Sequence, residues 1–228
     1  MRIDRLISNL PCYNRQAARH LLSSGRVRVN GVLTNDVRLD VRVFDSVQID
    51  GEVIQTGLPA RYLMLHKPTG YVSATEHPQH LTVLDLIGEP GGGLHLAGRL
   101  DLNTTGLLLL TNDGQWSRRL TSPHRHHSKV YLVKTEDPID PQCIDAFARG
   151  LYFAYEGITT LPAELDILEP RLARLTLQEG RYHQVKRMFG HFRNRVTGLH
   201  REAIGPLTVS ELAPGEFRSL TAAEIAAF

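Results

Sequence analysis

The chain has 228 residues, of which 42% are apolar and 22% are charged, and its formal net charge is +2. This composition is ordinary for a globular protein, so any affinity for nucleic acid must come from local clustering of charge. The two cysteines have no metal-site spacing, no apolar run approaches a membrane span, and the first residues lack a signal-peptide core. We therefore expect a soluble, cytoplasmic protein without a membrane anchor.

Two helices are predicted at the start of the chain. Apolar residues recur at helical spacing over residues 3–10, and Pro11 ends that helix. Asn14 is a favourable N-cap for a second helix over residues 15–24, because its side chain can accept from a free backbone N–H. Gly25 is typical of the residue that follows a helix.

Short strands are predicted after these helices. Valine and isoleucine alternate with polar residues in three short segments, 27–29, 41–43 and 47–49, and an Asn-Gly turn follows the first of them. Two helices and short strands make a compact module, to which we assign residues 1–57. Residues 58–61 are the expected linker to the rest of the chain.

Arginine dominates the first thirty residues. Arg15 and Arg19 lie four residues apart and share one helix face, which is compatible with phosphate binding and equally with a solvated surface. The segments RIDRLIS and NRQAARHLLSSGRVRVNG resemble the S4 RNA-binding domain over about residues 1–50. The resemblance implies two helices packed on a small sheet. The residues of this module that we expect to contact RNA are Arg2, Arg15, Arg19, Arg26 and Asn30.

Residues 62–228 predict a larger domain of strands with a few helices. Because strands and helices do not alternate regularly, we predict an α+β fold with a largely antiparallel sheet. The helix expected at 141–151 should bury Ile144, Phe147 and Ala148. Glycines 91–93 mark a loop, and Thr82 with Asp85 and Thr221 with Glu224 have the spacing of capping boxes that start helices. The other expected strands lie at 62–67, 94–96, 107–111, 129–135, 171–177 and 207–212, and the other helices at 83–87, 115–120, 182–192 and after Thr221.

Two windows of this domain contain basic residues and no acid. One lies between Asp113 and Glu136, and the other between Glu179 and Glu202. Either window alone is compatible with a solvated face, whereas both together with the N-terminal module favour a cleft that binds RNA. The expected RNA contacts here are Arg118, Arg125, Arg181 and Arg187. Histidines 124, 126 and 127 have no acid or cysteine at metal-site spacing, so no metal is expected.

The most distinctive stretch is LAGRLDLNTTGLLLLTNDG, residues 96–114. Taken alone, Asp101 is most simply a turn carboxylate paired with Arg99. The stretch resembles the catalytic motif of pseudouridine synthases, G-R-L-D followed by T-x-G-L, in the family that carries an N-terminal S4 domain and acts on ribosomal RNA. The family's later motifs follow in order as KVYLV, EGRYHQVKRMF and LHREAIGPL. GQWSRRLTSP and GRYHQVKRMF are most similar to the members that act on small-subunit (16S) RNA.

The resemblance implies that a uridine is isomerised to pseudouridine. Asp101 would be the single catalytic carboxylate, and Lys186 would keep it ionised. Tyr131 would stack on the uracil, and Leu199 would exclude water. We expect Arg99 to occupy the space that the flipped nucleotide vacates, or to clamp the backbone. The reaction is neither redox nor energy-requiring, and the chain has no phosphate loop or dinucleotide fingerprint, so no cofactor is expected.

Several alternatives stay open at this point. The substrate could be large-subunit RNA, or the chain could be a non-catalytic assembly factor that binds ribosomal RNA. Asp101 could attack C1′, add to C6 or deprotonate the sugar. No heptads or long apolar stripes are present, so a monomer is expected. One stretch departs from the family pattern, because Phe192-Arg193 stand where relatives tend to have small residues and a Gly before Asn194.

Overall fold

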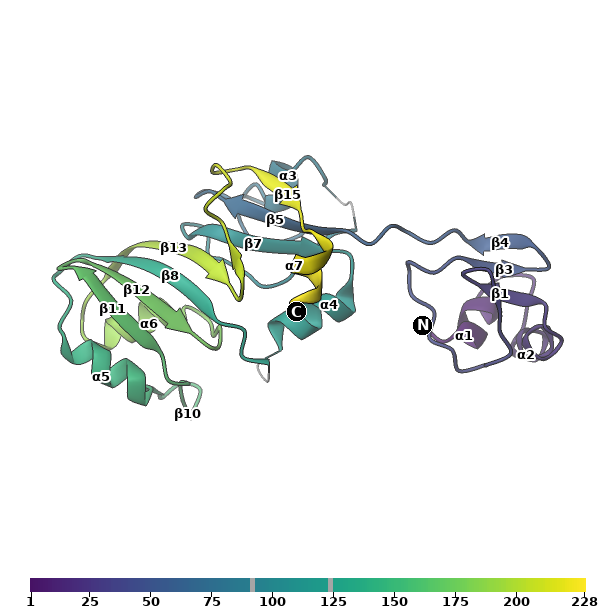
Figure 1. Cartoon of the computed structure of the whole chain (residues 1–228), viewed down its shortest axis with the longest axis horizontal. Coiled ribbons are helices and arrows are strands. Elements are labelled where there is room, and N and C mark those ends of the chain that lie inside the picture. The colour runs from purple at the N-terminus through teal and green to yellow at the C-terminus, as the bar shows by residue number, and fades with distance from the viewer. Residues whose placement is uncertain (91–92, 123–124) are drawn as a thin grey trace. The chain divides into compact units, whose positions relative to one another are not determined.

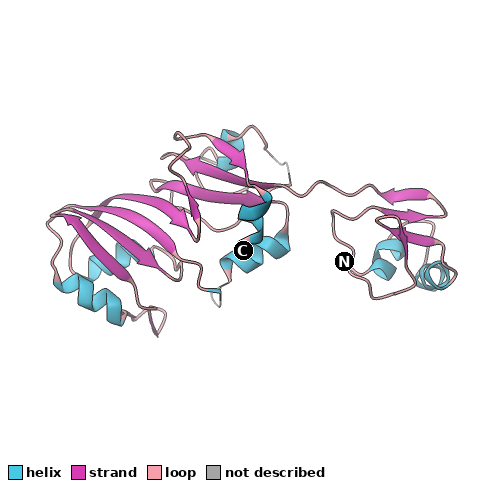
Figure 2. Ribbon diagram, in the orientation of Figure 1, coloured by secondary structure: helices cyan, strands magenta, loops and turns pink. Residues whose placement is uncertain are grey.

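The computed structural model describes every residue except 91–92 and 123–124, so two of the three glycines of the expected loop and His124 lie outside the described residues. The described chain divides into two compact units, Met1–Ala60 and Arg61–Phe228. Both units combine helices with strands, as Figure 2 shows. Each unit has its own buried core.

The N-terminal unit contains two helices and a small sheet, as expected. Asn14 caps the second helix, since its Oδ1 accepts from Ala17 N at 2.9 Å. Ile3, Ile7 and Leu22 are fully buried between the helices and the sheet. The elements are α1 (Ile3–Ser8), α2 (Arg15–Ser23), β1 (Val27–Val29), β2 (Val32–Leu33), β3 (Val47–Ile49) and β4 (Glu52–Gln55), with strand order β2-β1-β3-β4.

The strand expected at 41–43 is wrong. Residues 42–45 form a turn instead, because the Asp45 carboxylate accepts from Arg42 N at 2.7 Å. The Gln55 amide donates to the carbonyls of Arg42 and Asp45 at 2.7 and 2.8 Å. These side-chain bonds to the backbone compete with strand pairing and close the turn.

A mixed sheet forms the centre of the second unit (Figure 1). Its strand order is β11-β12-β8-β13-β7-β5-β15, with β14 paired to β13 and β6 to β7. Among the described strands, β13 and β7 run parallel and the other neighbours antiparallel, which confirms the expected fold class. The strands are β5 (Tyr62–Lys67), β6 (His95–Leu96), β7 (Thr105–Thr111), β8 (Lys129–Thr135), β11 (Glu164–Glu169), β12 (Leu172–Leu177), β13 (Val196–Ile204), β14 (Leu207–Thr208) and β15 (Phe217–Ser219). A separate pair joins β9 (Tyr152–Phe153) to β10 (Ile158–Thr159).

Both faces of β7 are covered, which explains its unbroken run of leucines. Leu108 and Leu110 belong to a core shared with α5 (Gln142–Arg149) and α6 (Gln184–His191). Leu107 and Leu109 belong to a second core with α4 (Gly114–Thr121). Figure 1 shows α5 and α6 beside one half of the sheet, and α4 with α7 (Ala222–Ala226) beside the other. Capping boxes start α3 (Val83–Leu86) and α7, as predicted at Thr82 and Thr221.

Part of the predicted burial on α5 is wrong. Phe147 is buried as expected, but Ile144 is 40% exposed and Ala148 is also exposed. The buried stripe instead runs through Cys143, Ala146 and Phe147, because that face of α5 packs against β11. Ile144 lies outside this stripe, so its hydrophobicity misled the prediction.

Seven of the described strands were not predicted, and one is shorter than expected. The unpredicted strands are β2, β4, β9, β10, β11, β13 and β15, of which β13 and β11 are the longest. The sequence of β13, VTGLHREAI, mixes glycine, charged and apolar residues and lacks alternation. β11 is an edge strand with mostly exposed, acidic residues. The strand expected at 207–212 is only β14, Leu207–Thr208.

The first prediction concerns Arg193, which has a left-handed backbone with φ of 55°. It follows α6 in a Schellman motif, in which Arg193 N donates to Gly190 O and Asn194 N to Phe189 O. Arg193→Gly should therefore raise the stability of the second unit by about 0.5–1 kcal/mol. Thermal unfolding measures this change. The control is Arg195→Gly, which removes an exposed side chain from a residue whose φ is not positive. If Arg195→Gly raised the stability as much as Arg193→Gly, the explanation would be contradicted.

The second prediction concerns Glu224 at the start of α7. A hydrogen bond from Arg218, at 2.7 Å, and the capping box lower the pKa of Glu224 to about 2. Its stabilisation is therefore present above the unfolded pKa of 4.5 and is lost as the pH falls towards 2. At pH 7, Glu224→Gln should lower the free energy of unfolding by about 1 kcal/mol. Urea titrations should show this difference vanish in acid, whereas exposed Glu76→Gln should change little at either pH.

Candidate active site

The loop that carries Asp101 is fixed by hydrogen bonds to its backbone. The Ser73 hydroxyl bonds both polar groups of Leu100, donating to its carbonyl at 2.7 Å and accepting from its N–H at 3.0 Å. Lys67 Nζ donates to the carbonyls of Leu102 and Thr104 at 3.1 and 2.8 Å. Asp101 lies between these anchor points, so its backbone is held before any substrate binds.

Lys67 is a buried cation that sequence reasoning did not identify as part of the site. It is 0% exposed and also donates to Pro68 O at 2.9 Å. Burial lowers the pKa of Lys67 to about 8, and the nearby charge of Asp101 opposes that shift. Lys67 therefore adds positive charge near Asp101 and holds the backbone of its loop in place.

Two side chains from the 181–188 segment contact the carboxylate of Asp101. Lys186 Nζ lies 2.6 Å from Oδ2, and His183 Nε2 lies 3.3 Å from Oδ1. Asp101 keeps 32% of its side chain exposed, so the pairs leave it accessible. Among the described residues, no ion pair joins Asp101 to Arg99, so a simple turn pair does not explain the carboxylate.

His183 is a contact that the sequence analysis missed. It is the N-cap of α6 and has φ of 50°, a left-handed conformation uncommon for histidine. Its ring stacks on Tyr182, with centroids 3.9 Å apart and planes 19° apart. The backbone turn and the stacking together direct His183 to Asp101. In the motif EGRYHQVKRMF, nothing about the position of His183 indicates that its side chain contacts Asp101.

The four expected catalytic residues line one small pocket. Asp101, Tyr131, Lys186 and Leu199 all contribute to its wall, together with Arg99. Tyr131 is 7% exposed on β8, and Leu199 lies on the neighbouring strand β13. The arrangement places a carboxylate, a cation, an aromatic ring and an aliphatic cover around one point.

A larger cavity of about 490 Å³ adjoins the Asp101 pocket, and we call it the flanking pocket. The two share Arg99, Tyr131, Gly180 and Arg181. Lys129 and Arg201 line only the flanking pocket.

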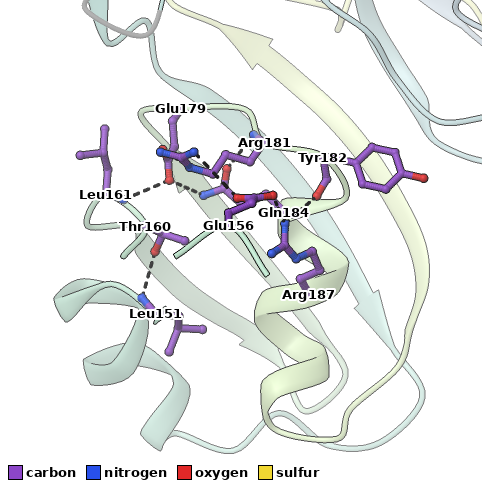
Figure 3. A network of polar contacts seen from close by, with 9 residues as sticks. All are labelled: Leu151, Glu156, Thr160, Leu161, Glu179, Arg181, Tyr182, Gln184 and Arg187. Atoms are coloured by element: carbon purple, nitrogen blue, oxygen red, sulfur yellow. Dashed lines mark hydrogen bonds and ion pairs between the residues drawn. The ribbon is translucent and has the colours of Figure 1, made fainter. Parts of the chain in front are cut away.

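The basic residues expected to contact RNA differ in their surroundings. Arg181 and Arg187 pair with carboxylates of the same chain, Arg181 with Glu179 at 2.8 Å and Arg187 with Glu156 at 2.8 Å (Figure 3). Arg187 also lies 3.7 Å from the centre of the Phe153 ring. Arg99, Arg118 and Arg125 are exposed.

The N-terminal unit gathers some of its expected contacts on one surface. Arg2, Arg15 and Arg19 line a common pocket on this unit. Arg26 pairs with Asp50. The amide of Asn30 donates to Asp45 at 2.8 Å and accepts from Ser46 N at 2.9 Å, so this side chain stabilises a turn.

The described residues bear on two features, a cluster of metal ligands and a helix able to span a membrane. They contain no cluster of three or more histidine, cysteine or acidic side chains that would hold a metal. His124, one of the three histidines considered above, lies outside them. No helix among them has the length and apolar character needed to cross a membrane.

Comparison with known proteins decides the family. The model of the RNA pseudouridylate synthase family matches residues 61–191, and that of the S4 domain matches residues 1–47. The chain belongs to the RNA pseudouridylate synthase family. It is thus an RNA pseudouridine synthase, an isomerase, that carries an S4 domain.

Relatives of this pseudouridine synthase span nearly the whole chain. A protein of Pseudomonas aeruginosa named ribosomal small subunit pseudouridine synthase A is 57% identical over 227 residues, 99% of each chain. A protein of the same name from Escherichia coli is 45% identical over 228 residues, again 99% of each chain. A crystal structure described as a pseudouridylate synthase is 39% identical, has a TM-score of 0.72, and is matched over 100% of this chain and 99% of its own.

The third prediction tests the charge partners of Asp101. Lys186→Met should lower kcat about 10²-fold, because one charged donor to the carboxylate is lost. Lys186→Arg should retain most of the activity, and His183→Asn, which tolerates the left-handed backbone, should cost about tenfold. Single-turnover measurements of pseudouridine formation give these rates. Equal losses for Lys186→Met and Lys186→Arg would show that charge is not what Lys186 supplies.

Proposed function

We propose that this pseudouridine synthase isomerises one specific uridine of small-subunit (16S) ribosomal RNA, with Asp101 as its catalytic carboxylate. The observation that carries the proposal is the placement of Asp101. Its loop is anchored by Lys67 and Ser73, and its carboxylate lies 2.6 Å from Lys186 in a pocket walled by Tyr131 and Leu199.

The chemistry requires only one such carboxylate. The bond from uracil N1 to ribose C1′ breaks, the base turns, and a bond forms from C5 to C1′. C5 then loses its proton and N1 gains one, so no water enters the product and no electrons are exchanged. Glycoside hydrolysis uses two carboxylates because water must be activated as well. A single aspartate beside a cation is therefore sufficient here, as nucleophile or as base.

The pocket supports a division of roles among the other side chains. Lys186 favours the ionised form of Asp101 through its opposite charge. Tyr131 offers a ring on which the uracil can stack, and its hydroxyl is available for the proton transfer at C5. Leu199 keeps the detached base from water. A stacked or paired uridine must flip out to reach this pocket, and exposed Arg99 at its wall is suited to hold the vacated space.

The proposed substrate rests on two observations. The relatives named ribosomal small subunit pseudouridine synthase A match from end to end, and the S4 domain supplies the basic residues Arg15 and Arg19 on one helix face. The intact set of Asp101, Tyr131 and Lys186 opposes a purely binding role, which needs no such trio. Because ribosomal RNA is made and assembled in the bacterial cytoplasm, we place the enzyme there, acting as a monomer.

The fourth prediction tests substrate and catalytic residue together. Unmodified small-subunit RNA, naked or partly assembled into particles, is incubated with the wild type, with Asp101→Asn, and with the control Asp145→Asn on the exposed side of α5. Pseudouridine is then mapped by carbodiimide-blocked reverse transcription. We expect one new stop with the wild type and the control, and none with Asp101→Asn, which should still bind RNA.

Other outcomes would redirect the proposal. If the same assay on large-subunit RNA gave the only stop, the substrate would be large-subunit RNA instead. A stop that persists with Asp101→Asn would remove Asp101 from catalysis. Silence on every RNA would favour the non-catalytic assembly factor.

A further inference from the structure

The flanking pocket contains a buried arginine that is only partly satisfied. Arg201 on β13 is 3% exposed. Its Nε donates to Leu107 O at 2.8 Å, and its Nη1 lies 3.4 Å from Arg99 O. Among the described residues, Nη2 is buried and has no hydrogen-bond partner. A buried guanidinium N–H without an acceptor is costly, so the pocket favours a ligand that supplies one.

A second cation lies in the same pocket. Lys129 Nζ donates to His127 O at 2.8 Å. Burial lowers the pKa of Lys129, the charge of Arg201 lowers it further, and Glu179 partly opposes the shift. Lys129 and Arg201 therefore repel each other, and an anion bound close to both would offset this repulsion.

The carboxylates that line the pocket already have partners. Glu179 accepts from Leu161 N at 3.0 Å and from Gln184 Nε2 at 2.8 Å, and it also pairs with Arg181. Glu156 pairs with Arg187. Figure 3 shows these contacts as one continuous network. Neither acid is therefore free to act as the main counter-ion of Lys129 and Arg201.

The rim of the pocket carries an aromatic side chain suited to a nucleotide. Tyr182 is 75% exposed, and Figure 3 shows its ring directed away from the polar network. Its stacking on His183 holds the ring in place. Exposed aromatic rings beside a positive groove are the features with which proteins bind single-stranded nucleic acid.

We propose that the flanking pocket binds a backbone phosphate of the RNA strand next to the target uridine, through Lys129 and Arg201. This inference rests on the proposed function, because the phosphate must belong to an RNA whose uridine occupies the Asp101 pocket. The two pockets share Tyr131 and Arg99, so a continuous strand passes from one to the other. By binding that phosphate, Lys129 and Arg201 then fix the path of the RNA strand along which the uridine reaches Asp101.

The test combines one substitution with one chemical change in the RNA. Lys129→Met removes a pocket cation, and Lys134→Met removes an exposed lysine of the same strand, β8, as the control. Short RNAs that contain the target uridine carry a single neutral methylphosphonate linkage, moved one position at a time. Binding is measured with the Asp101→Asn protein, alone and combined with each lysine change, and turnover is measured with wild-type Asp101.

This experiment is the fifth prediction. Lys129→Met should weaken binding about tenfold, as expected for one charge-assisted contact, and Lys134→Met should change it little. A methylphosphonate at one linkage next to the target uridine should weaken binding by a similar factor when Lys129 is present. The same linkage should cause no further loss of binding when Lys129→Met is present. The negative slope of the logarithm of the association constant against the logarithm of the salt concentration should become less steep by about 0.7 for Lys129→Met. Lys129→Arg should restore binding, which separates loss of charge from damage to the fold.

Contrary results are equally clear. Losses that add at every linkage, or a salt slope unchanged by Lys129→Met, would overturn the phosphate site even if the wild type forms pseudouridine normally. Absence of pseudouridine on every RNA would instead overturn the proposed function, while the binding data still report on the pocket.

Discussion

The candidate active site depends on the close approach of two parallel strands, β7 and β13. They meet where Gly106 pairs with Arg201, and a Cβ at Gly106 would lie 2.2 Å from Arg201 O. Gly106 also has φ of 107°, so only glycine fits this point in both space and conformation. The glycine of the T-x-G-L pattern therefore joins the loop of Asp101, just before β7, to the strand that carries Leu199.

Polar contacts then convert this junction into a rigid site. The Arg201 side chain returns from β13 to the carbonyls of Leu107 and Arg99, while Lys67 holds the other end of the loop. Such groups are arranged during folding, so the backbone around Asp101 is held in place before an RNA binds. Lys67 and Arg201 position the loop of Asp101 through its backbone, whereas Lys186 contacts the carboxylate itself.

The sequence predicted best what depends on neighbouring residues. The caps at Asn14 and Thr82 involve contacts within four residues, and each is found in the structure. The motif pattern also led to four residues that line the pocket of Asp101. What was missed depends on distant pairing or unusual backbone. β13 is stabilised by strands far away in the chain, and the contact of His183 requires a left-handed turn. Arg201 is one of the basic residues between Glu179 and Glu202, and the sequence did not predict its burial because that burial comes from the fold.

The four consecutive leucines of β7 have a consequence for how the chain is made. These leucines are synthesised about 90 residues before β13, the strand that covers one edge of β7. Pairings so distant form slowly, and an uncovered apolar strand invites aggregation while it waits. β5 is synthesised earlier and pairs antiparallel along β7, so one edge can be covered during elongation. The N-terminal unit, whose contacts are local, can fold well before the catalytic core closes.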